Sequence, residues 1–291
     1  MNKEFLDLAE QLKSSVSCTV RLNELMSGHT SFKIGGPADI LVLPESIEQL
    51  REVLKVVKET VVPLTLLGNG SNVLVRDKGI RGIVIKLVFG SGYSLALASY
   101  KAMECGKTGM EFAVGIPGSI GGAVYMNAGA YDGEMQNIVN CVKVMDLQGN
   151  ERVLTAEELN FGYRKTSLQN SGLIVTEVTL KMPSGNKDEI KSKMDDFSHR
   201  RISKQPLEMP SAGSMFKRPP GYFAGTLIDQ AGLKGYTVGG AQISTKHAGF
   251  VVNVGGATAA DVLQLIKDVQ TKIKAGVGVE LQPEVLVIGE E

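Results

Sequence analysis

Residues 109–129 form a glycine-rich stretch, GMEFAVGIPGSIGGAVYMNAG, in which the backbone must be the working surface of any site. Gly115, Gly118 and Gly122 carry no side chain, so main-chain N–H groups can approach a ligand closely, and the intervening proline stiffens the turn. A row of such amides suits a pyrophosphate group. A second stretch, LGNGSNVLV at residues 67–75, runs into a strand-like apolar segment. Two such stretches predict one long ligand of dinucleotide size, although turns at strand ends use glycine in the same way.

Two familiar nucleotide-binding motifs do not fit these stretches. The sequence Gly68-Asn69-Gly70 lacks the third glycine of the Rossmann fingerprint and precedes a strand, whereas that fingerprint opens a helix. The sequence GKT at residues 106–108 resembles the end of a P-loop, but Lys101 occupies the position of the leading glycine. A dinucleotide would therefore have to bind in another way.

The size and charge of the chain limit its function classes. Its 291 residues, of which 43% are hydrophobic, suffice for two folded domains. The 31 basic and 31 acidic residues cancel, so no overall attraction to nucleic acid or to an anionic membrane is expected. We therefore expect small molecules to be the partners.

Cysteine usage and the N-terminal region predict a cytoplasmic protein. The three cysteines are scattered and odd in number, which disfavours a disulfide framework or a zinc site and favours a reducing compartment. The three histidines are equally dispersed, so no metal is expected. The first ten residues are charged and amphipathic, unlike a signal peptide, and no stretch approaches the roughly twenty apolar residues of a membrane span.

Hydrophobic spacing and capping residues predict mixed α and β structure. Ser46 is a suitable N-cap for a helix over residues 47–59, and strands at residues 40–43 and 64–67 flank that helix. Thr258 is expected to begin a C-terminal helix that Gly276 stops. The predicted helices cover residues 3–15, 47–59, 94–105, 187–203 and 258–274, and further strands cover residues 73–75, 82–87, 138–147 and 173–182.

A domain boundary is predicted near residue 203. The segment that follows, KQPLEMP at residues 204–210, contains two prolines and cannot continue a helix. Residues 1–203 would then form a first module with a leading helix, and residues 204–291 a second, α+β domain.

Six short motifs together resemble one enzyme family. In chain order they are SFKIGG at residues 31–36, GNGSNV at 68–73, GIPGSIGGAVYMNAG at 115–129, FGYR at 161–164, SAGSMFK at 211–217 and QPEV at 282–285. Over residues 20–289 this order is similar to that of the UDP-N-acetylenolpyruvoylglucosamine reductases. The resemblance implies an α+β fold, with an FAD-binding module of the vanillyl-alcohol-oxidase (PCMH) type in two subdomains and a separate substrate-binding domain. It also implies NADPH as reductant and a role in peptidoglycan precursor synthesis.

The chain departs from the family pattern after Leu87. Only Val88 and Phe89 separate it from Gly90, where the family normally has a further strand pair. If this shortening is genuine, part of the sheet of the FAD module is missing. The spacing from residue 163 to residue 214 also leaves little room for an extra substrate-capping loop, so the chain resembles the subgroup without one.

The family's reaction reduces an enolpyruvyl ether, whose electron-rich double bond resists hydride. Negative charge that builds beside the attacked carbon can spread into the carboxylate, and a preorganised cation and acid should face it. By similarity, Arg164 offers a guanidinium fork to the carboxylate, and a protonated Glu284 donates a second hydrogen bond. Ser214 would protonate the carbanion carbon, which requires a well-positioned hydroxyl.

Each of these three residues also has a purely structural interpretation. Arg164 could pack on Tyr163 at the surface, and Ser214 could make a turn hydrogen bond. Glu284 follows a proline beside an apolar strand and could simply be solvated at the strand end. Their joint occurrence in matching motifs favours catalysis.

The resemblance also assigns binding residues. The FAD-binding candidates are Gly68, Asn69, Gly70, Ser71, Asn72, Val73, Gly115, Ile116, Pro117, Gly118, Ser119 and Gly122. Neither loop contains His or Cys, so the attachment of FAD is expected to be non-covalent. The candidates for binding the substrate's diphosphate or NADPH are Tyr163, Lys204, Lys217 and Arg218.

Two other functions stay open at this point. An FAD-dependent oxidase of the same fold, acting on an alcohol or a lactone, would have no use for Arg164, Ser214 and Glu284 together. A non-catalytic nucleotide-binding protein would be favoured if the shortening after Leu87 prevents FAD from binding.

Overall fold

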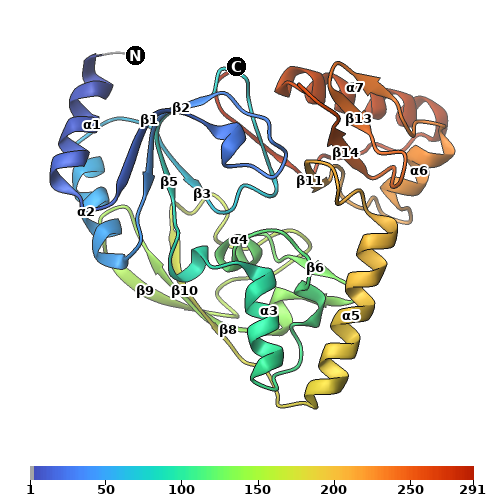
Figure 1. Ribbon diagram of the computed structural model, residues 1–291, viewed down its shortest axis with the longest axis horizontal. Helices are drawn as coiled ribbons and strands as arrows, with labels where there is room; N and C mark the ends of the chain where they lie inside the picture. Colours follow the sequence, from blue (N-terminus) through green and yellow to red (C-terminus); the bar gives the residue numbers. More distant parts are fainter. Residues whose placement is uncertain (1–2) are drawn as a thin grey trace. The chain divides into compact units, whose positions relative to one another are not determined.

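The structure is a computed structural model that describes the backbone of residues 3–291 and the side chains of residues 5–291. Its helices are α1 (Lys3–Ser15), α2 (Ile47–Lys58), α3 (Leu95–Glu104), α4 (Ile120–Tyr125), α5 (Lys187–Lys204), α6 (Ala224–Gln230) and α7 (Ala259–Val277) (Figure 1). Its strands in the first half are β1 (Thr19–Leu25), β2 (Pro37–Leu43), β3 (Leu64–Leu67), β4 (Val73–Val75), β5 (Ile80–Lys86), β6 (Gly129–Ala130), β7 (Gly133–Glu134) and β8 (Val139–Met145). The later strands are β9 (Glu151–Thr155), β10 (Ile174–Leu180), β11 (Ser211–Ser214), β12 (Thr237–Val238), β13 (Ala241–Ile243), β14 (Phe250–Asn253) and β15 (Leu286–Ile288). Short 3-10 helices are η1 (Met26–Gly28), η2 (Gly90–Gly92), η3 (Glu111–Ala113) and η4 (Met135–Asn137).

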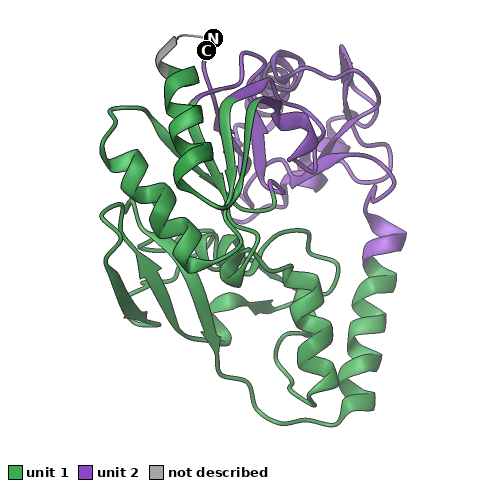
Figure 2. Cartoon of the chain, turned by 60° about the vertical axis from the view of Figure 1, so that its left-hand side comes forward, with its two compact units in different colours: residues 1–22, 39–69, 82–200 green, residues 23–38, 70–81, 201–291 purple. Residues whose placement is uncertain are grey.

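The chain forms two compact units and passes between them several times (Figure 2). Unit 1 takes the residues up to 22, 39–69 and 82–200, and unit 2 takes residues 23–38, 70–81 and 201–291. The C-terminal part of unit 2 therefore begins close to the predicted boundary at residue 203. Residues 23–38 and 70–81 also belong to unit 2, which a linear division into 1–203 and 204–291 does not include.

The first part of unit 1 is a sheet covered by α1 and α2. Its strand order is β1-β2-β5-β3, and β3 pairs with β5 in parallel. The Oγ of Ser46 accepts a hydrogen bond of 3.2 Å from the Gln49 N–H and so begins α2 where the sequence predicts. The apolar face of α2, which includes Leu50 and Val53, is buried in a core shared with α1, β2 and β5.

The second part of unit 1 is an antiparallel sheet of order β10-β8-β9. Its core includes buried residues of α3, α4, β8 and β9. Ser94 is the N-cap of α3 and accepts a hydrogen bond of 3.4 Å from the Leu97 N–H.

The connection from β5 to the second sheet is short. Val88 and Phe89 lead directly into η2, where Ser91 Oγ donates a hydrogen bond to the Val175 carbonyl of β10. A Cβ on Gly90 would lie 2.3 Å from the Thr176 carbonyl oxygen, so the backbone of η2 approaches β10 closely. The chain thus covers the edge of β10 with η2 at these residues.

Helix α5 supports the glycine-rich loop that begins at Gly115, within unit 1. Its Ile190, Met194 and Phe197 form a buried cluster with Val114, the residue before Gly115. The rings of Tyr131 and Phe197 stack with centroids 4.4 Å apart. The amphipathic spacing of α5 therefore anchors this loop rather than leaving the helix wholly solvated.

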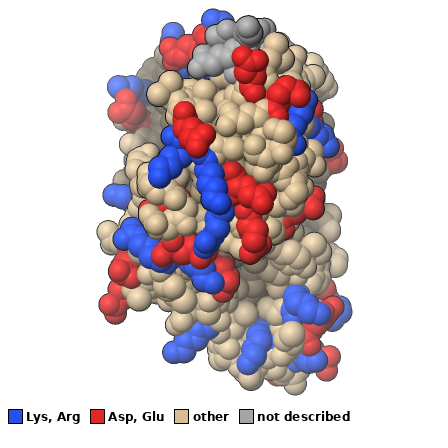
Figure 3. Space-filling model, turned by 90° about the vertical axis from the view of Figure 1, so that its left-hand side faces the viewer, with Lys and Arg blue, Asp and Glu red and all other residues tan. Residues whose placement is uncertain are grey.

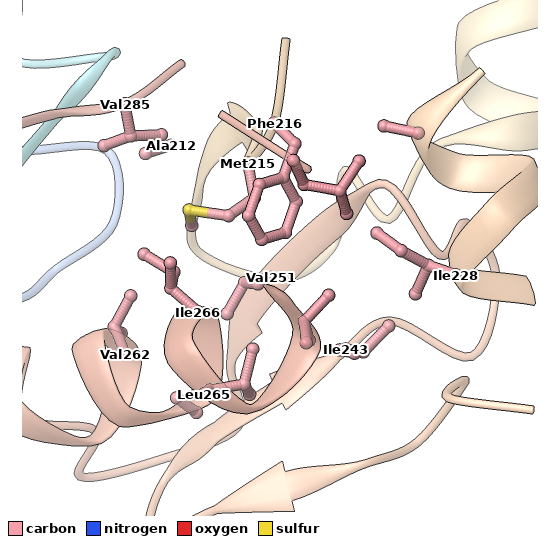
Figure 4. Close-up of a cluster of buried hydrophobic side chains, with 14 of the residues drawn as sticks. Ala212, Met215, Phe216, Ile228, Ile243, Val251, Val262, Leu265, Ile266 and Val285 are labelled. Carbon is pink, nitrogen blue, oxygen red and sulfur yellow. The ribbon is translucent and has the colours of Figure 1, made fainter. Parts of the chain in front are cut away.

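Unit 2 is a sheet of order β11-β14-β13-β12 with α6 and α7. Met215 and Phe216, which follow β11, belong to the same core as Val251, Leu265 and Ile266 (Figure 4). The core also includes buried residues from residues 23–38 and 70–81, the two inserted segments of unit 2, namely Phe32, Ile34 and Leu74. Their burial explains why residues 23–38 and 70–81 group with the C-terminal part of the chain.

A carboxylate from the second inserted segment caps the longest helix of unit 2. Asp77 accepts hydrogen bonds from the N–H groups of Ala259 (2.7 Å) and Ala260 (2.9 Å). Negative charge is favoured there by the helix dipole. Thr258 and Asp261 add a capping box at the same end.

The predicted helices agree with the structure to within a few residues at their ends, with one correction. Gly276 does not stop α7, because the helix continues to Val277 and ends at Gly278, whose φ of 71° is left-handed. Among the elements for which the sequence predicted no range are α4, α6, β1 and β9. These elements are short or, like β1 and β9, largely exposed, so their hydrophobic pattern is weak.

Surface charge and hydropathy show no dominant feature. In the part of the chain that the structure describes, no helix is long and apolar enough to cross a bilayer. On the face shown in Figure 3, basic and acidic side chains are interspersed. This mixture agrees with the balanced composition.

Candidate active site

The two glycine-rich stretches meet within unit 1 at Gly68 and Ser119. A Cβ on Gly68 would lie 2.7 Å from Ser119 Oγ, so a larger residue would displace the serine. Gly115 and Gly118 have φ values of 70° and 140°, which residues with a side chain rarely adopt. Among the described residues, the backbone N–H groups of Gly115, Gly118 and Ser119 donate no hydrogen bond within the protein. The loop therefore presents unpaired amide donors.

The side chain of Ser119 begins the helix that follows this loop. Its Oγ accepts a hydrogen bond of 3.2 Å from the Gly122 N–H and caps α4. The side chain is buried, with 3% of the residue exposed. Because the cap uses an acceptor lone pair, the hydroxyl hydrogen can still be donated to another group. A Cβ on Gly122 would come within 3.1 Å of the same oxygen.

The second half of the glycine-rich stretch at residues 67–75 belongs to unit 2. Gly70 has φ of 65°, and a Cβ there would lie 2.2 Å from the His29 carbonyl oxygen. In the described part of the chain, the N–H groups of Gly70, Ser71 and Asn72 also donate no hydrogen bond within the protein. Val73 begins β4, which pairs in parallel with β15. Rows of unpaired amides in a tight turn are typical of anion sites.

Arg164 lies at the tip of a tight turn in unit 1. Gly162 and Lys165 exchange two backbone hydrogen bonds, of 2.9 and 3.1 Å, which leaves Tyr163 and Arg164 at the two central positions. Arg164 has φ of 55°. A left-handed residue with a side chain costs about 1 kcal/mol, so glycine or asparagine is the usual choice there. Strain of this kind is typical of functional positions.

Buried polar side chains fix this turn. Asn127, 1% exposed, donates from Nδ2 to the Gly162 carbonyl (3.0 Å) and to Glu134 (3.1 Å), and its Oδ1 accepts from the Gln136 N–H (3.0 Å). Thr166, also buried, donates to the Tyr125 carbonyl at 2.9 Å. The turn is thereby tied to the end of α4.

Ser214 is exposed at the end of β11 in unit 2. The pairing of β11 with β14 is irregular between Ser211 and Ser214, and Gly213 within that irregularity has φ of 79°. A bulge of this kind turns the next side chain to a new direction. The neighbouring Met215 is fully buried and holds the end of the strand in the core.

Glu284 lies beside Ser214 on a paired segment of unit 2. Its N–H donates to the Met215 carbonyl at 2.8 Å, and Pro283 forms a bridge with Phe216. Its own carbonyl accepts from Asn72 Nδ2 at 3.3 Å. Backbone pairing therefore places Glu284 opposite Met215, the residue after Ser214, and the Glu284 carbonyl contacts Asn72 of the amide-rich residues 70–72.

The candidate binding cations lie in different places. The Lys217 N–H donates to the Gln282 carbonyl at 2.8 Å, which puts Lys217 beside the segment of Glu284. Arg218 is exposed and its Cζ lies 4.0 Å from the Phe223 ring centroid. Lys204 is exposed at the end of α5. In unit 1, Arg164 Cζ lies 5.1 Å from the ring centroid of Tyr163, which is 56% exposed.

The structural interpretation of Arg164 as an arginine stacked on Tyr163 is thus compatible with its position, but it does not explain the strained turn.

A surface hollow in unit 1 contains none of the predicted residues and is lined by Gln136, Asn137, Ala156, Glu157, Asn160 and Phe161.

Sequence reasoning missed the residues that support the site. Asn127 lies within the quoted glycine-rich motif, and a buried asparagine after a helix end could have been suspected of closing a turn. Ser31, within the SFKIGG motif, donates from Oγ to the Ser211 carbonyl at 2.7 Å, and its N–H donates to the Gly70 carbonyl at 3.0 Å. No local pattern signals that contact, because its partner lies 180 residues away.

Comparisons with known proteins match both the N-terminal and the C-terminal part of the chain. Residues 205–288 match the C-terminal domain of UDP-N-acetylenolpyruvoylglucosamine reductase, and residues 38–92 match an FAD-binding domain. A crystal structure of UDP-N-acetylenolpyruvylglucosamine reductase (MurB) from Thermus caldophilus superposes with a TM-score of 0.80 at 39% identity, covering 93% of this chain and 98% of that one. The predicted α+β fold and its FAD-binding module are confirmed.

Two curated relatives match along nearly their whole length. The UDP-N-acetylenolpyruvoylglucosamine reductase of Clostridioides difficile (strain 630) is 49% identical over 286 residues, covering 94% of each chain. That of Clostridium perfringens (strain SM101 / Type A) is 50% identical over 301 aligned positions, covering 99% of this chain and 98% of the relative. These 301 positions exceed the 291 residues of this chain, so the relative has residues without a counterpart here. The chain belongs to the UDP-N-acetylenolpyruvoylglucosamine reductase family.

Proposed function

We propose that this chain is an FAD-dependent oxidoreductase that reduces UDP-N-acetylglucosamine enolpyruvate to UDP-N-acetylmuramate with NADPH, in peptidoglycan precursor synthesis. The observation that carries the proposal is the combination of family membership with the three residues of the proposed mechanism. Arg164 occupies a strained turn, and Ser214 and Glu284 lie on paired segments.

FAD fits the residues present. The unpaired N–H groups at residues 70–72 of unit 2 and those at Gly115, Gly118 and Ser119 of unit 1 are each suited to phosphate oxygens, and a side chain at Gly68 or Gly70 would intrude on neighbouring atoms. The remaining candidates, Asn69, Val73, Ile116, Pro117 and Gly122, shape the same two loops. When bound and reduced by NADPH, FAD supplies the hydride that the reaction needs.

Arg164 would bind the substrate's carboxylate. The reaction adds a hydride to the terminal carbon of the enolpyruvyl group, and the resulting negative charge spreads into that carboxylate. A guanidinium presents parallel N–H donors that match two carboxylate oxygens and stays charged throughout. Because the turn fixes the backbone of Arg164, little reorganisation is needed as the charge develops.

Ser214 would then donate a proton to the adjacent carbon, so that one hydride and one proton add across the double bond. A serine hydroxyl is a weak acid, and its use depends on accurate placement against a strongly basic carbanion. The bulge at Gly213 and the buried Met215 hold that position. Glu284, on the paired segment, would have to carry its proton to donate a hydrogen bond to the developing charge.

The remaining candidates would bind the charged parts of the ligands. Lys204, Lys217 and Arg218 are suited to the diphosphate of the substrate or to the phosphates of NADPH, and Tyr163 can pack beside the substrate held by Arg164. We infer that only these small molecules are partners, with no nucleic acid and no membrane insertion. Three free cysteines suit a reducing compartment, which supports a cytoplasmic location.

An anaerobic visible spectrum tests the function. The purified protein should show the oxidised flavin band, lose it with NADPH, and regain it when UDP-N-acetylglucosamine enolpyruvate is added without oxygen. A bleached flavin that only oxygen restores would contradict the reductase and favour an oxidase. A folded protein that cannot be loaded with FAD would contradict both enzymes and favour a non-catalytic nucleotide-binding protein.

A further inference from the structure

The geometry points to Gln169 as a positioning residue that holds Arg164 in its working conformation, an inference that rests on the proposed function of Arg164. Gln169 follows the turn of Arg164 by five residues and belongs to the same unit. Its side-chain amide donates from Nε2 to the Arg164 carbonyl and to the Tyr125 carbonyl, both at 3.1 Å. Gln169 thereby joins the arginine to the last residue of α4.

The chemistry of the two partners explains why an amide is needed. Both are carbonyl oxygens, which only accept, so the NH₂ end of Gln169 must face them and uses one hydrogen for each. The Met126 sulfur lies 3.8 Å from the same nitrogen. A carboxylate of equal size would point oxygens at two carbonyls, and an apolar side chain would leave the Arg164 carbonyl without this donor.

The contact has a mechanical consequence. Arg164 has φ of 55°, a conformation that an arginine leaves readily unless its surroundings fix it. The Gly162 end of the turn is already fixed by the buried Asn127. Gln169 fixes the Arg164 carbonyl itself, so the two amides constrain the turn from both ends.

The same contact relates the arginine to the proposed cofactor loop. Ser119 begins α4 and Tyr125 ends it, so one short helix separates the unpaired amides of Gly115, Gly118 and Ser119 from the carbonyl that Gln169 binds. Gln169 therefore fixes the backbone of Arg164, from which the guanidinium extends, relative to the helix that follows the cofactor loop within unit 1. Its loss should affect substrate reduction while leaving flavin reduction by NADPH intact.

The test measures the two half-reactions separately in the FAD-loaded protein by anaerobic stopped-flow absorbance. Gln169→Met keeps the length of the side chain and loses both donated hydrogen bonds. We expect it to slow flavin reoxidation by UDP-N-acetylglucosamine enolpyruvate about tenfold, the equivalent of one such bond, with flavin reduction by NADPH unchanged. Gln169→Glu should slow reoxidation at least as much.

Ser167→Ala is the matched control, because Ser167 donates to the Glu158 carbonyl at 2.8 Å in the same loop without contacting Arg164. Its half-reactions should stay at wild-type rates. Equal slowing of both half-reactions by Gln169→Met, or a normal reoxidation rate in that variant, would overturn the inference.

A double-mutant cycle separates this inference from the function on which it rests. If Gln169 acts through Arg164, Gln169→Met should cause no further loss of reoxidation rate in an Arg164→Ala background. An independent tenfold loss in that background would overturn the positioning role alone. A normal reoxidation rate in Arg164→Ala itself would instead overturn the catalytic assignment of Arg164, and the role of Gln169 with it.

Discussion

The two units hold their proposed catalytic groups in different ways. In unit 2, backbone pairing places Glu284 opposite Met215, the neighbour of Ser214, since the Glu284 N–H binds the Met215 carbonyl and Pro283 bridges to Phe216. In unit 1, Arg164 lies on a strained turn whose place is fixed by polar side chains, above all Asn127 and Gln169.

This difference predicts that substitutions in the two units act in different ways. A backbone contact survives most substitutions, so changes near Ser214 should act only through the group removed. A turn fixed by side chains can be disturbed by residues that never touch the substrate. Unit 1 should therefore be the more sensitive of the two to substitutions outside the proposed catalytic set.

The largest effect is expected from Ser214→Ala. The substitution removes the proposed proton donor while Met215 and the strand pairing hold the backbone, so flavin reoxidation by substrate should fall about 10²- to 10⁴-fold. Flavin reduction by NADPH and the melting temperature should stay unchanged, which anaerobic stopped-flow and thermal unfolding would measure. Turnover close to the wild-type rate would exclude Ser214 as the acid and favour the oxidase.

Arg164→Lys should have the next largest effect. Lysine keeps the positive charge but loses the planar fork, and we expect flavin reoxidation by substrate to slow about 10²-fold. Lys217→Ala, on the other unit, offers a comparison, because removing a binding cation should raise the KM for substrate more than it lowers kcat. If Arg164→Lys changed only KM, the arginine would be a ground-state binding group.

The fold could be predicted from the sequence because helix caps and hydrophobic spacing are local signals, whereas Arg164, Ser214 and Glu284 were assigned by similarity to the family and stay predictions. Ser46 and Thr258 are N-caps that precede helices with periodic apolar residues, and the side chain of each accepts a hydrogen bond from a backbone N–H in the first turn, as expected. The glycine-rich stretches were informative because their backbone must adopt φ values that few other residues allow, as at Gly115.

What the sequence could not predict are contacts between distant segments. Asn127 meets a turn 35 residues away, and Gln169 meets the end of α4 44 residues away. Neither partner is a side chain, so residue types carry no trace of the pairing. The inclusion of Phe32 and Leu74 in the core of unit 2 is hidden for the same reason, since each lies in a segment that otherwise reads as part of the N-terminal module.

Asn127→Ala tests the comparison through stability. It removes three hydrogen bonds from a buried site and puts alanine at φ of 42°, so the free energy of unfolding should fall by about 3 kcal/mol. Ser211→Ala in unit 2 should cost less than about 0.5 kcal/mol, since its Oγ accepts a weak hydrogen bond of 3.5 Å from the Gly213 N–H. Urea unfolding measures both, and equal costs would contradict the distinction between the units.

The smallest effect concerns pH and again distinguishes the units. Burial lowers the pKa of His247 in unit 2 below its usual value of 6.5. The charges of Lys234 and Lys204 also lower this pKa, whereas the charge of Asp229 raises it. Its Nδ1 accepts the Gly249 N–H at 3.0 Å, which requires an unprotonated nitrogen. In unit 1, burial raises the pKa of Glu111, but hydrogen bonds from Thr108 and Gly109 outweigh it and leave that pKa lowered.

The lowered pKa values of His247 and Glu111 affect stability in two separate pH ranges. Below pH 6.5 the unfolded chain binds a proton at His247 that the folded unit resists, so unit 2 should lose stability as the pH falls from 6.5 through the lowered pKa. The contribution of Glu111 is present above its usual value of 4.5 and is lost only as the pH falls through its lowered pKa. Between pH 7 and 5, amide hydrogen exchange should therefore accelerate in unit 2 relative to unit 1, after correction for the intrinsic exchange rate. His247→Gln should flatten that response and the exposed His199→Gln should not, whereas an equal response of both units in the wild type would show that they lose stability together.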